Sequence, residues 1–153
     1  MSSELTAATL TVTITEALAV VHATSADNLD FAQTTTHTFS SVGQVDKRII
    51  KLSTTALTTV ATFDNSDPSG GTFKRGDIKY IRVTNLDGSA SLQVGLDDSD
   101  TDAAYSTVAA DASIIYTSAT VEGNSGGTTL DNALTLRVKG AVNQPLEVLI
   151  ASA

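Results

Sequence analysis

The chain has 153 residues, a mass of 15.8 kDa and a formal net charge of −8 at pH 7. This length suits one folded domain, which would bury roughly two-thirds of the surface that the unfolded chain exposes. Charged residues make up 17%, whereas Thr and Ser together supply 40 of the 153 residues. The composition excludes a coiled-coil rod and a highly charged disordered tail. Since the chain has no Cys, it also excludes a disulfide scaffold, thiol chemistry and Cys-based zinc sites.

The negative charge is concentrated in one region. Residues 83–136 contain eight acidic residues and no Lys or Arg, whereas the rest of the chain has nine acidic and nine basic residues. A large negative charge disfavours binding to a phosphate backbone, so we expect no nucleic-acid partner. The longest apolar run near the N-terminus, residues 17–21, is too short to span a bilayer, and we expect no membrane partner.

The first predicted element is a strand over residues 9–15, where Thr alternates with Leu10, Val12 and Ile14. Thr15 is a candidate N-cap, and residues 16–23 are predicted to form a helical turn. Alternation of polar and apolar residues predicts further strands at 31–39, 45–52, 56–63, 105–108, 113–117, 133–139 and 146–151.

The strongest local signal is Asp87-Gly88, which separates the alternating runs 77–86 and 89–96. Asp-Gly is typical of a two-residue hairpin turn, because both central positions of that turn require a positive φ. Pairing Leu86 with Ser89 would place Val83 opposite Leu92, with the apolar residues on one face. The sequence therefore predicts a tight β-hairpin at this position.

The fold class predicted from these elements is all-β. About eight to ten short antiparallel strands separated by turn residues indicate a single-domain β-sandwich of jelly-roll type spanning residues 1–153. Residues 1–15 are a candidate N-terminal strand or arm that exchanges between subunits. Loops rich in Asp, Asn, Ser and Gly are expected on the surface at 64–71, 97–104 and 122–128.

One acidic loop has part of a calcium-binding pattern. Asp98, Asp100 and Asp102 alternate as oxygen ligands do at the start of a calcium loop. However, Ala103 stands where the sharp-turn Gly is needed, and Ala109 where the bidentate Glu is needed. A solvated loop is the better interpretation, and we expect no bound metal.

No catalytic motif accompanies the potentially reactive residues. His22 and His37 lack the spacing of a metal-binding pair, and no G-x-S-x-G element supports a Ser-His-Asp triad. The Gly-rich pieces 69–71 and 124–127 lack the Lys-Ser/Thr of a phosphate-binding loop. We therefore expect neither enzymatic activity nor a cofactor.

The basic residues of the first half form two clusters, and two interpretations have equal weight. The clusters are solvated strand faces, or they form an interaction patch that meets the acidic loops of a neighbouring molecule. The candidate patch consists of Lys47, Arg48, Lys51, Lys74, Arg75, Lys79 and Arg82.

Two segments carry a resemblance to a known group of proteins. Asp46-Lys47-Arg48-Ile49-Ile50-Lys51-Leu52, followed by Lys79-Tyr80-Ile81-Arg82-Val83-Thr84-Asn85-Leu86-Asp87, resembles small structural proteins of tailed bacteriophages, especially those of marine and cyanobacterial phages. The resemblance extends over residues 9–96. It implies an all-β virion component without catalytic activity, made in the host cytoplasm and built by repetition into a shell or tail.

Three functions are compatible with this resemblance and composition. The first is a capsid decoration or cement protein, expected as a homotrimer, that binds the major capsid protein on the outer head surface. The second is a tail, neck or fibre-associated virion protein. The third is a β-sandwich that binds carbohydrate or a host surface, although 3 Tyr, 4 Phe and no Trp offer few aromatic platforms for sugars.

Overall fold

The computed structural model describes residues 8–20, 29–64, 72–97, 104–117 and 133–153. These residues form eleven strands and no helix, hence none that is long and apolar enough to cross a membrane. The strands are β1 (Ala8–Val20), β2 (Leu29–Val42), β3 (Gln44–Lys51), β4 (Thr58–Asp64), β5 (Thr72–Lys74), β6 (Ile78–Asn85), β7 (Leu92–Asp97), β8 (Ala104–Val108), β9 (Ser113–Tyr116), β10 (Thr135–Lys139) and β11 (Pro145–Ser152).

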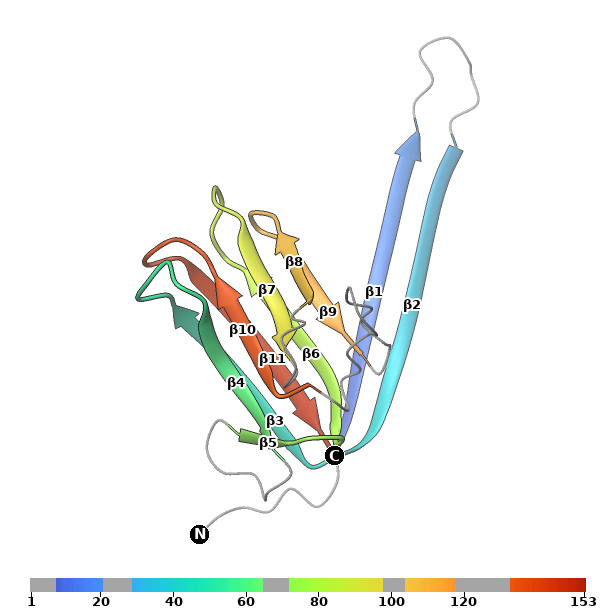
Figure 1. Cartoon of the computed structure of the whole chain (residues 1–153). Helices are drawn as coiled ribbons and strands as arrows, with labels where there is room; N and C mark the ends of the chain where they lie inside the picture. The colour runs from blue at the N-terminus through green and yellow to red at the C-terminus, as the bar shows by residue number, and fades with distance from the viewer. Residues whose placement is uncertain (1–7, 21–28, 65–71, 98–103, 118–132) are drawn as a thin grey trace.

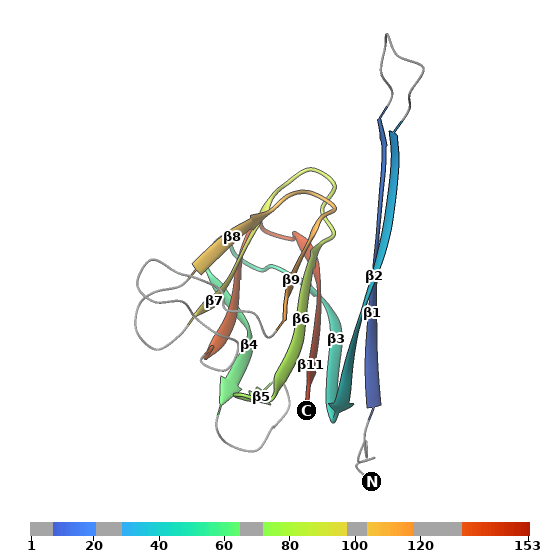
Figure 2. The same ribbon diagram turned by 90° about the vertical axis from the view of Figure 1, so that its right-hand side faces the viewer.

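Strands β3 to β11 form a sandwich of two sheets, which confirms the predicted β-sandwich. One sheet has the order β3-β11-β6-β9, and the other has the order β5-β4-β10-β7-β8. Figure 1 and Figure 2 show the two sheets facing each other, with β1 and β2 outside them. All pairs are antiparallel except β4 with the three-residue β5, a strand that was not predicted from the sequence.

The strand order follows from folding one long antiparallel ribbon onto itself. Four pairs make up the ribbon: β3 with β11, β4 with β10, β6 with β9, and β7 with β8. When the ribbon rolls up, β11 also pairs with β6, and β10 also pairs with β7. This is the arrangement of a jelly roll, in which consecutive strands mostly cross from one sheet to the other.

The core lies between the two sheets and consists of alternate residues of each strand. In β11, Leu146, Val148 and Ile150 are fully buried, and in β10 Leu136 and Val138 are fully buried. Both strands are central in their sheets, so each contributes side chains to the middle of the core. The period-two alternation in the sequence therefore places apolar residues inside, as expected for half-buried strands.

The tight hairpin predicted at Asp87-Gly88 is wrong. Strand β6 pairs with β11 and β9, whereas β7 pairs with β10 and β8 in the opposite sheet. Neither Asp87 nor Gly88 has the positive φ that the predicted turn requires. Instead, the Asp87 carboxylate accepts hydrogen bonds from the backbone N–H groups of Ser89 and Ala90, both at 2.9 Å. The segment is a crossover between the sheets, and the pairing of distant strands prevailed over the local turn signal.

Two buried amide side chains hold this crossover in place. Asn85 donates from Nδ2 to the carbonyl oxygens of Ala90 at 2.7 Å and Ala109 at 3.0 Å. Gln144 donates from Nε2 to Asn85 Oδ1 at 3.0 Å and accepts the Ala141 N–H at 2.7 Å. A side chain at Gly140 would clash with the Gln144 amide. One end of the sandwich is thus closed by hydrogen bonds between three loops.

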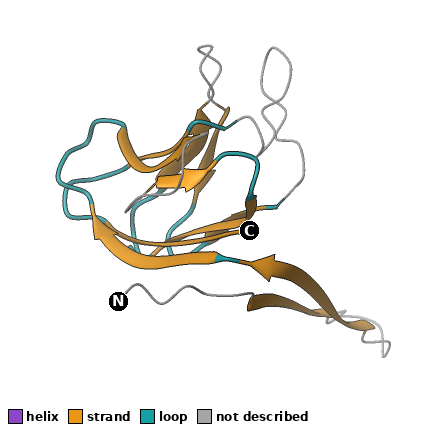
Figure 3. Ribbon diagram, turned by 90° about the horizontal axis from the view of Figure 1, so that it is seen from below, coloured by secondary structure: helices purple, strands orange, loops and turns teal. Residues whose placement is uncertain are grey.

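Strands β1 and β2 form a separate two-stranded hairpin, which we call the arm. They pair from Ala8 with Val42 to Val20 with Leu29. The helical turn predicted for residues 16–23 is wrong over residues 16–20, which belong to β1; residues 21–23 lie outside the described part. Continuous pairing with β2 satisfies the backbone N–H and C=O groups here, and this pairing overrides the weak N-cap signal. Figure 3 shows the arm as a ribbon apart from the sandwich.

The base of the arm packs on the outer surface of the β3-β11-β6-β9 sheet. Phe39 of β2 lies against Tyr80 of β6, with ring centroids 5.8 Å apart, and Tyr80 is buried by this contact. Ser41, at a left-handed φ of 57°, lies at the bend where the chain leaves the arm for β3. The remaining members of this small cluster are Ala8, Leu10, Val12, Val42, Leu149 and Ala151.

Candidate functional site

The outer surface of the β3-β11-β6-β9 sheet combines charged and apolar side chains. Glu147 of β11 lies between two cations: Lys47 Nζ of β3 is 3.3 Å from one carboxylate oxygen, and Arg82 of β6 is 2.6 Å from the other. Burial raises the pKa of the Glu147 carboxyl, but the hydrogen bonds from Arg82 and Lys47 outweigh burial and hold this pKa below its ordinary value of 4.5. The three strands are thereby joined by one ion cluster.

Arg48 points away from this surface. Alternation along β3 places Arg48 with the half-buried residues, whereas Lys47 and Lys51 are exposed on the other side. The Arg48 guanidinium lies 3.0 Å from the Asp46 carboxylate and donates to the backbone carbonyl of Val60 in β4. Arg48 therefore connects the edge strand β3 of one sheet to β4 of the other, which is a structural role.

The other predicted basic residues lie around the turn between β5 and β6. Lys74 Nζ is 3.4 Å from the Asp77 carboxylate, and Gly76 has a φ of 85° in the turn between them. The backbone N–H of Arg75 donates to the Asp64 carbonyl at 2.6 Å. Lys79 is half-buried on β6. Of the seven predicted patch residues, the structure brings Lys47 and Arg82 together on one carboxylate.

Exposed apolar residues lie beside the ion cluster. Val45 is 50% exposed and Ile49 is 66% exposed, both on the outward side of the edge strand β3. Ile115 of β9, paired with Arg82, is also exposed. Val45 pairs in register with Ala151, which the arm buries. We call the sandwich surface that the arm covers, formed by Tyr80, Leu149 and Ala151, the arm footprint. The uncovered apolar residues begin where this footprint ends.

The arm has two different faces beyond its base. One face carries three cross-strand threonine pairs, Thr11 with Thr38, Thr13 with Thr36 and Thr15 with Thr34, and all six side chains are exposed. The hydroxyls of Thr15 and Thr34 are 3.4 Å apart. The other face continues the apolar stripe of the base through Ile14, which is 38% exposed. A two-stranded ribbon exposed on both faces is marginally stable by itself.

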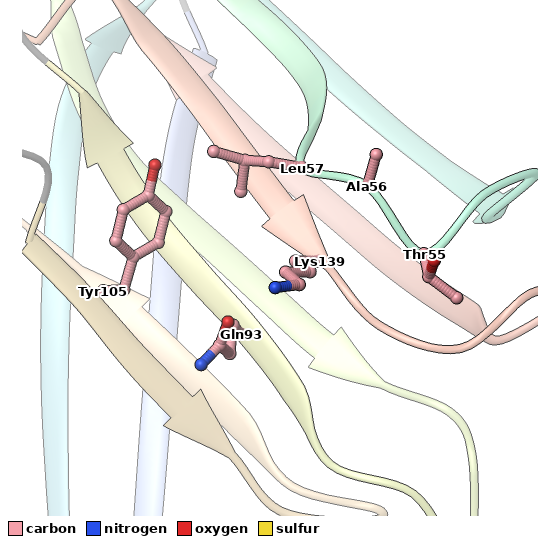
Figure 4. Close-up of a pocket in the computed structure, with 6 residues that line it drawn as sticks. All are labelled: Thr55, Ala56, Leu57, Gln93, Tyr105 and Lys139. Atoms are coloured by element: carbon pink, nitrogen blue, oxygen red, sulfur yellow. The ribbon is translucent and has the colours of Figure 1, made fainter.

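A shallow hollow of about 340 Å³ lies on the outer surface of the opposite sheet (Figure 4). Gln93 of β7, Tyr105 of β8 and Lys139 of β10 line it from three neighbouring strands. Thr55, Ala56 and Leu57, which precede β4, form its remaining wall. The hollow offers one ammonium, one amide, the hydroxyls of Thr55 and Tyr105, and an exposed tyrosine ring. These groups suit a small polar or anionic ligand.

The described residues contain no group of three His or acidic side chains able to hold a metal ion. His37 lies exposed on the arm, whereas His22 and the acidic loop residues Asp98, Asp100 and Asp102 lie outside the described part of the chain. Most of the predicted surface loops 64–71, 97–104 and 122–128 also lie outside it.

Neither the arm footprint nor the hollow was predicted from the sequence. Both bring together residues from distant segments, and their members carry no local motif. The alternation of Leu10, Val12 and Ile14 with threonine was the one signal of a two-faced N-terminal strand. No protein-family model, curated protein or solved structure matches this chain.

Proposed function

We propose that this protein is a non-enzymatic structural component of a tailed-bacteriophage virion. In this proposal it is a decoration or cement protein that binds the outer surface of the head as a homo-oligomer, expected to be a trimer, and contacts the major capsid protein. Its role is to stabilise the shell by bridging neighbouring capsid subunits. The resemblance of residues 9–96 to phage structural proteins gives the proposal its biological setting.

The arm is the observation that carries this proposal. Its thirteen-residue strand β1 spans about 40 Å, and among the arm side chains that the structure describes, those at the base pack on the sandwich of the same chain. Fixing a ribbon of this length costs conformational entropy that its own exposed side chains do not offset. An arm of this kind is useful to a subunit that must reach a neighbour in an assembly.

The jelly-roll sandwich supports the same proposal. Rolling the ribbon leaves few free strand edges among the described residues: β3 and β9 in one sheet, β5 and β8 in the other. A compact sandwich with a projecting arm is a suitable building block for a repeated shell, because closed symmetric assemblies reuse one interface many times.

Reconstitution on particles tests the proposal. Purified protein added to heads that lack it should bind at a regular stoichiometry and raise the temperature at which the particles release their DNA. Native mass measurement of the free protein should give the mass of three chains. Absence of binding to any head would rule out the decoration role, and immunogold labelling over the tail would assign the protein to the tail, neck or fibre instead.

The hollow on the opposite sheet favours a second candidate function, carbohydrate binding. Tyr105 offers a ring for stacking on a sugar, and Gln93 and Lys139 offer hydrogen bonds to hydroxyl or carboxylate groups. A glycan array should then show hits that Tyr105→Ala abolishes and that Tyr80→Phe, at the arm contact, preserves. An array without hits would eliminate this function.

A further inference from the structure

The arm has an apolar stripe that its own sandwich covers only in part. Leu10 and Val12 are half-buried at the base against Tyr80, Leu149 and Ala151. The next residue of the stripe, Ile14, is 38% exposed, and Glu16 after it is also exposed. The part of the stripe that carries Ile14 and Glu16 is therefore available to another molecule.

A matching stripe lies uncovered on the edge strand β3. Its outward side chains are Val45, Lys47, Ile49 and Lys51 in order. Ile49 is the most exposed of the large apolar residues that the structure describes, and Lys51 forms no ion pair among the described residues. The stripe adjoins the arm footprint at Val45, so the surface that binds one arm base continues into a free surface.

The two stripes are complementary in spacing and charge. In both, an isoleucine is followed two residues later by a charged residue: Glu16 follows Ile14, and Lys51 follows Ile49. Both strands are extended, so the two steps have the same length of roughly 7 Å. When Ile14 packs on Ile49, Glu16 can reach the ammonium of Lys51. Within one chain these residues do not cover each other, because both isoleucines are exposed.

We propose that the β3 stripe receives the distal arm of a second copy of this chain, with Ile14 on Ile49 and the Glu16 carboxylate at the Lys51 ammonium. This inference rests on the proposed function, since it names the partner and the surface of the arm. The contact is heterologous: each subunit gives an arm and receives one, so the assembly closes into a ring if the rotation between subunits allows it. The receiving β3 stripe lies on the outward side of its strand and takes no part in the sandwich core.

Thiol cross-linking tests this contact without background, because the chain has no Cys. A tagged chain carrying Ile14→Cys is mixed with an untagged chain carrying Ile49→Cys, and a short bis-maleimide is added. Stacked sheets lie about 10 Å apart, which such a reagent spans. The expected result is a gel shift to the summed mass of the two different chains. The matched control replaces Ile49→Cys with Thr107→Cys, which is exposed on the opposite sheet and should give no mixed product.

Charge reversal provides a second measurement that does not depend on cross-linking. Glu16→Lys and Lys51→Glu should each weaken self-association about fivefold in sedimentation, and the double reversal should restore it. Both side chains are exposed, so folding is preserved.

Two outcomes would overturn the inference; the first leaves the proposed function intact, whereas the second also contradicts the trimer expected there. If the chain forms oligomers that give no mixed product between positions 14 and 49, the arm docks elsewhere. If the chain stays monomeric at all concentrations, no copy receives the arm. Binding to heads, measured separately, reports on the proposed function in either case.

Discussion

The sandwich and the arm are both antiparallel, but different interactions hold them. In the sandwich, each strand has one face against a second sheet, and residues such as Leu136 and Ile150 are completely removed from water. The arm has no second sheet beyond its base, and its threonine face is exposed. The stability of the sandwich therefore comes from burial, whereas the arm depends on its base and on whatever covers its distal half.

This difference separates what the chain needs to fold from what it needs to associate. Substitutions in the sandwich should change the free energy of unfolding of the whole molecule. Substitutions in the arm should change local protection and self-association with little effect on the sandwich. The following predictions test that separation, beginning with the largest expected effect.

Truncation of the sandwich core should have the largest effect. Leu136 is completely buried in the central strand β10, so Leu136→Ala should lower the free energy of unfolding by about 3 kcal/mol through lost burial and a cavity. Chemical denaturation followed by circular dichroism measures this loss. The matched arm variant, Ile14→Ala, should change the value by less than about 0.5 kcal/mol. Equal losses would show that arm and sandwich unfold as one unit.

Loss of the buried amide pair should have the next largest effect. Asn85→Ala leaves the Gln144 amide without one of its buried partners and removes the side-chain donor to the Ala109 carbonyl and the shorter of two to the Ala90 carbonyl. The free energy of unfolding should fall by about 2 kcal/mol. Gln93→Ala, which removes an exposed amide, is the control. A loss below about 0.5 kcal/mol for Asn85→Ala would mean that the loops close without this network.

Loosening the base of the arm should have a local effect. Phe39→Ala removes the ring that packs on Tyr80 and should weaken attachment of the arm by about 1 kcal/mol. Hydrogen exchange should then accelerate in β1 and β2 while the protection of β10 and β11 stays unchanged. Thr38→Ala, on the opposite face of the same strand, should leave both rates unaltered. Faster exchange in β11 with Phe39→Ala would contradict the idea that the arm and the sandwich are stabilised separately.

The smallest predicted effect is a pH dependence that originates at Glu147. Since the folded-state pKa of this carboxyl lies below its ordinary value of 4.5, its stabilisation is complete above about pH 4.5 and is lost as the pH falls through the folded-state pKa. The contribution should stay below about 1 kcal/mol, because the cluster is partly exposed. Glu147→Gln should flatten the decline in stability below pH 4.5 that chemical denaturation measures, and an unchanged decline would contradict this origin.

The sequence was sufficient to predict the fold class and most strands, but not how the strands pair. Alternation along β3 and β11 is a local property, and the burial of Ile50 and Val148 could be anticipated from it. Pairing of β3 with β11 joins residues about a hundred positions apart, and no local pattern encodes it. For the same reason Asp87-Gly88 was mistaken for a hairpin turn.

The candidate surfaces also combine residues that could be recognised along one strand with contacts between distant strands that could not be predicted. The charged residues of β3 and β6 were recognised from composition, but their common partner Glu147 comes from β11, which pairs with both strands. Arg48 and Lys47 are neighbours in sequence and point to opposite sides of β3, which a list of basic residues does not reveal. The high Thr content is partly explained by the arm, where threonine favours the extended strand conformation and also suits an exposed position.

The rolled ribbon also sets the order in which this chain can fold. The two central strands, β10 and β11, come later in the chain than every strand they join. Until residues 135–152 have been synthesised, β3 has no strand to pair with. The edge of β6 that pairs with β11 and the edge of β7 that pairs with β10 are also unpaired until then. The arm, by contrast, pairs two consecutive strands and can close first. On the ribosome, β1 and β2 can therefore pair early, but the arm gains its base only when Leu149 and Ala151 of β11 arrive. The sandwich waits for the same last two strands, a slow step because all its closing contacts are long-range.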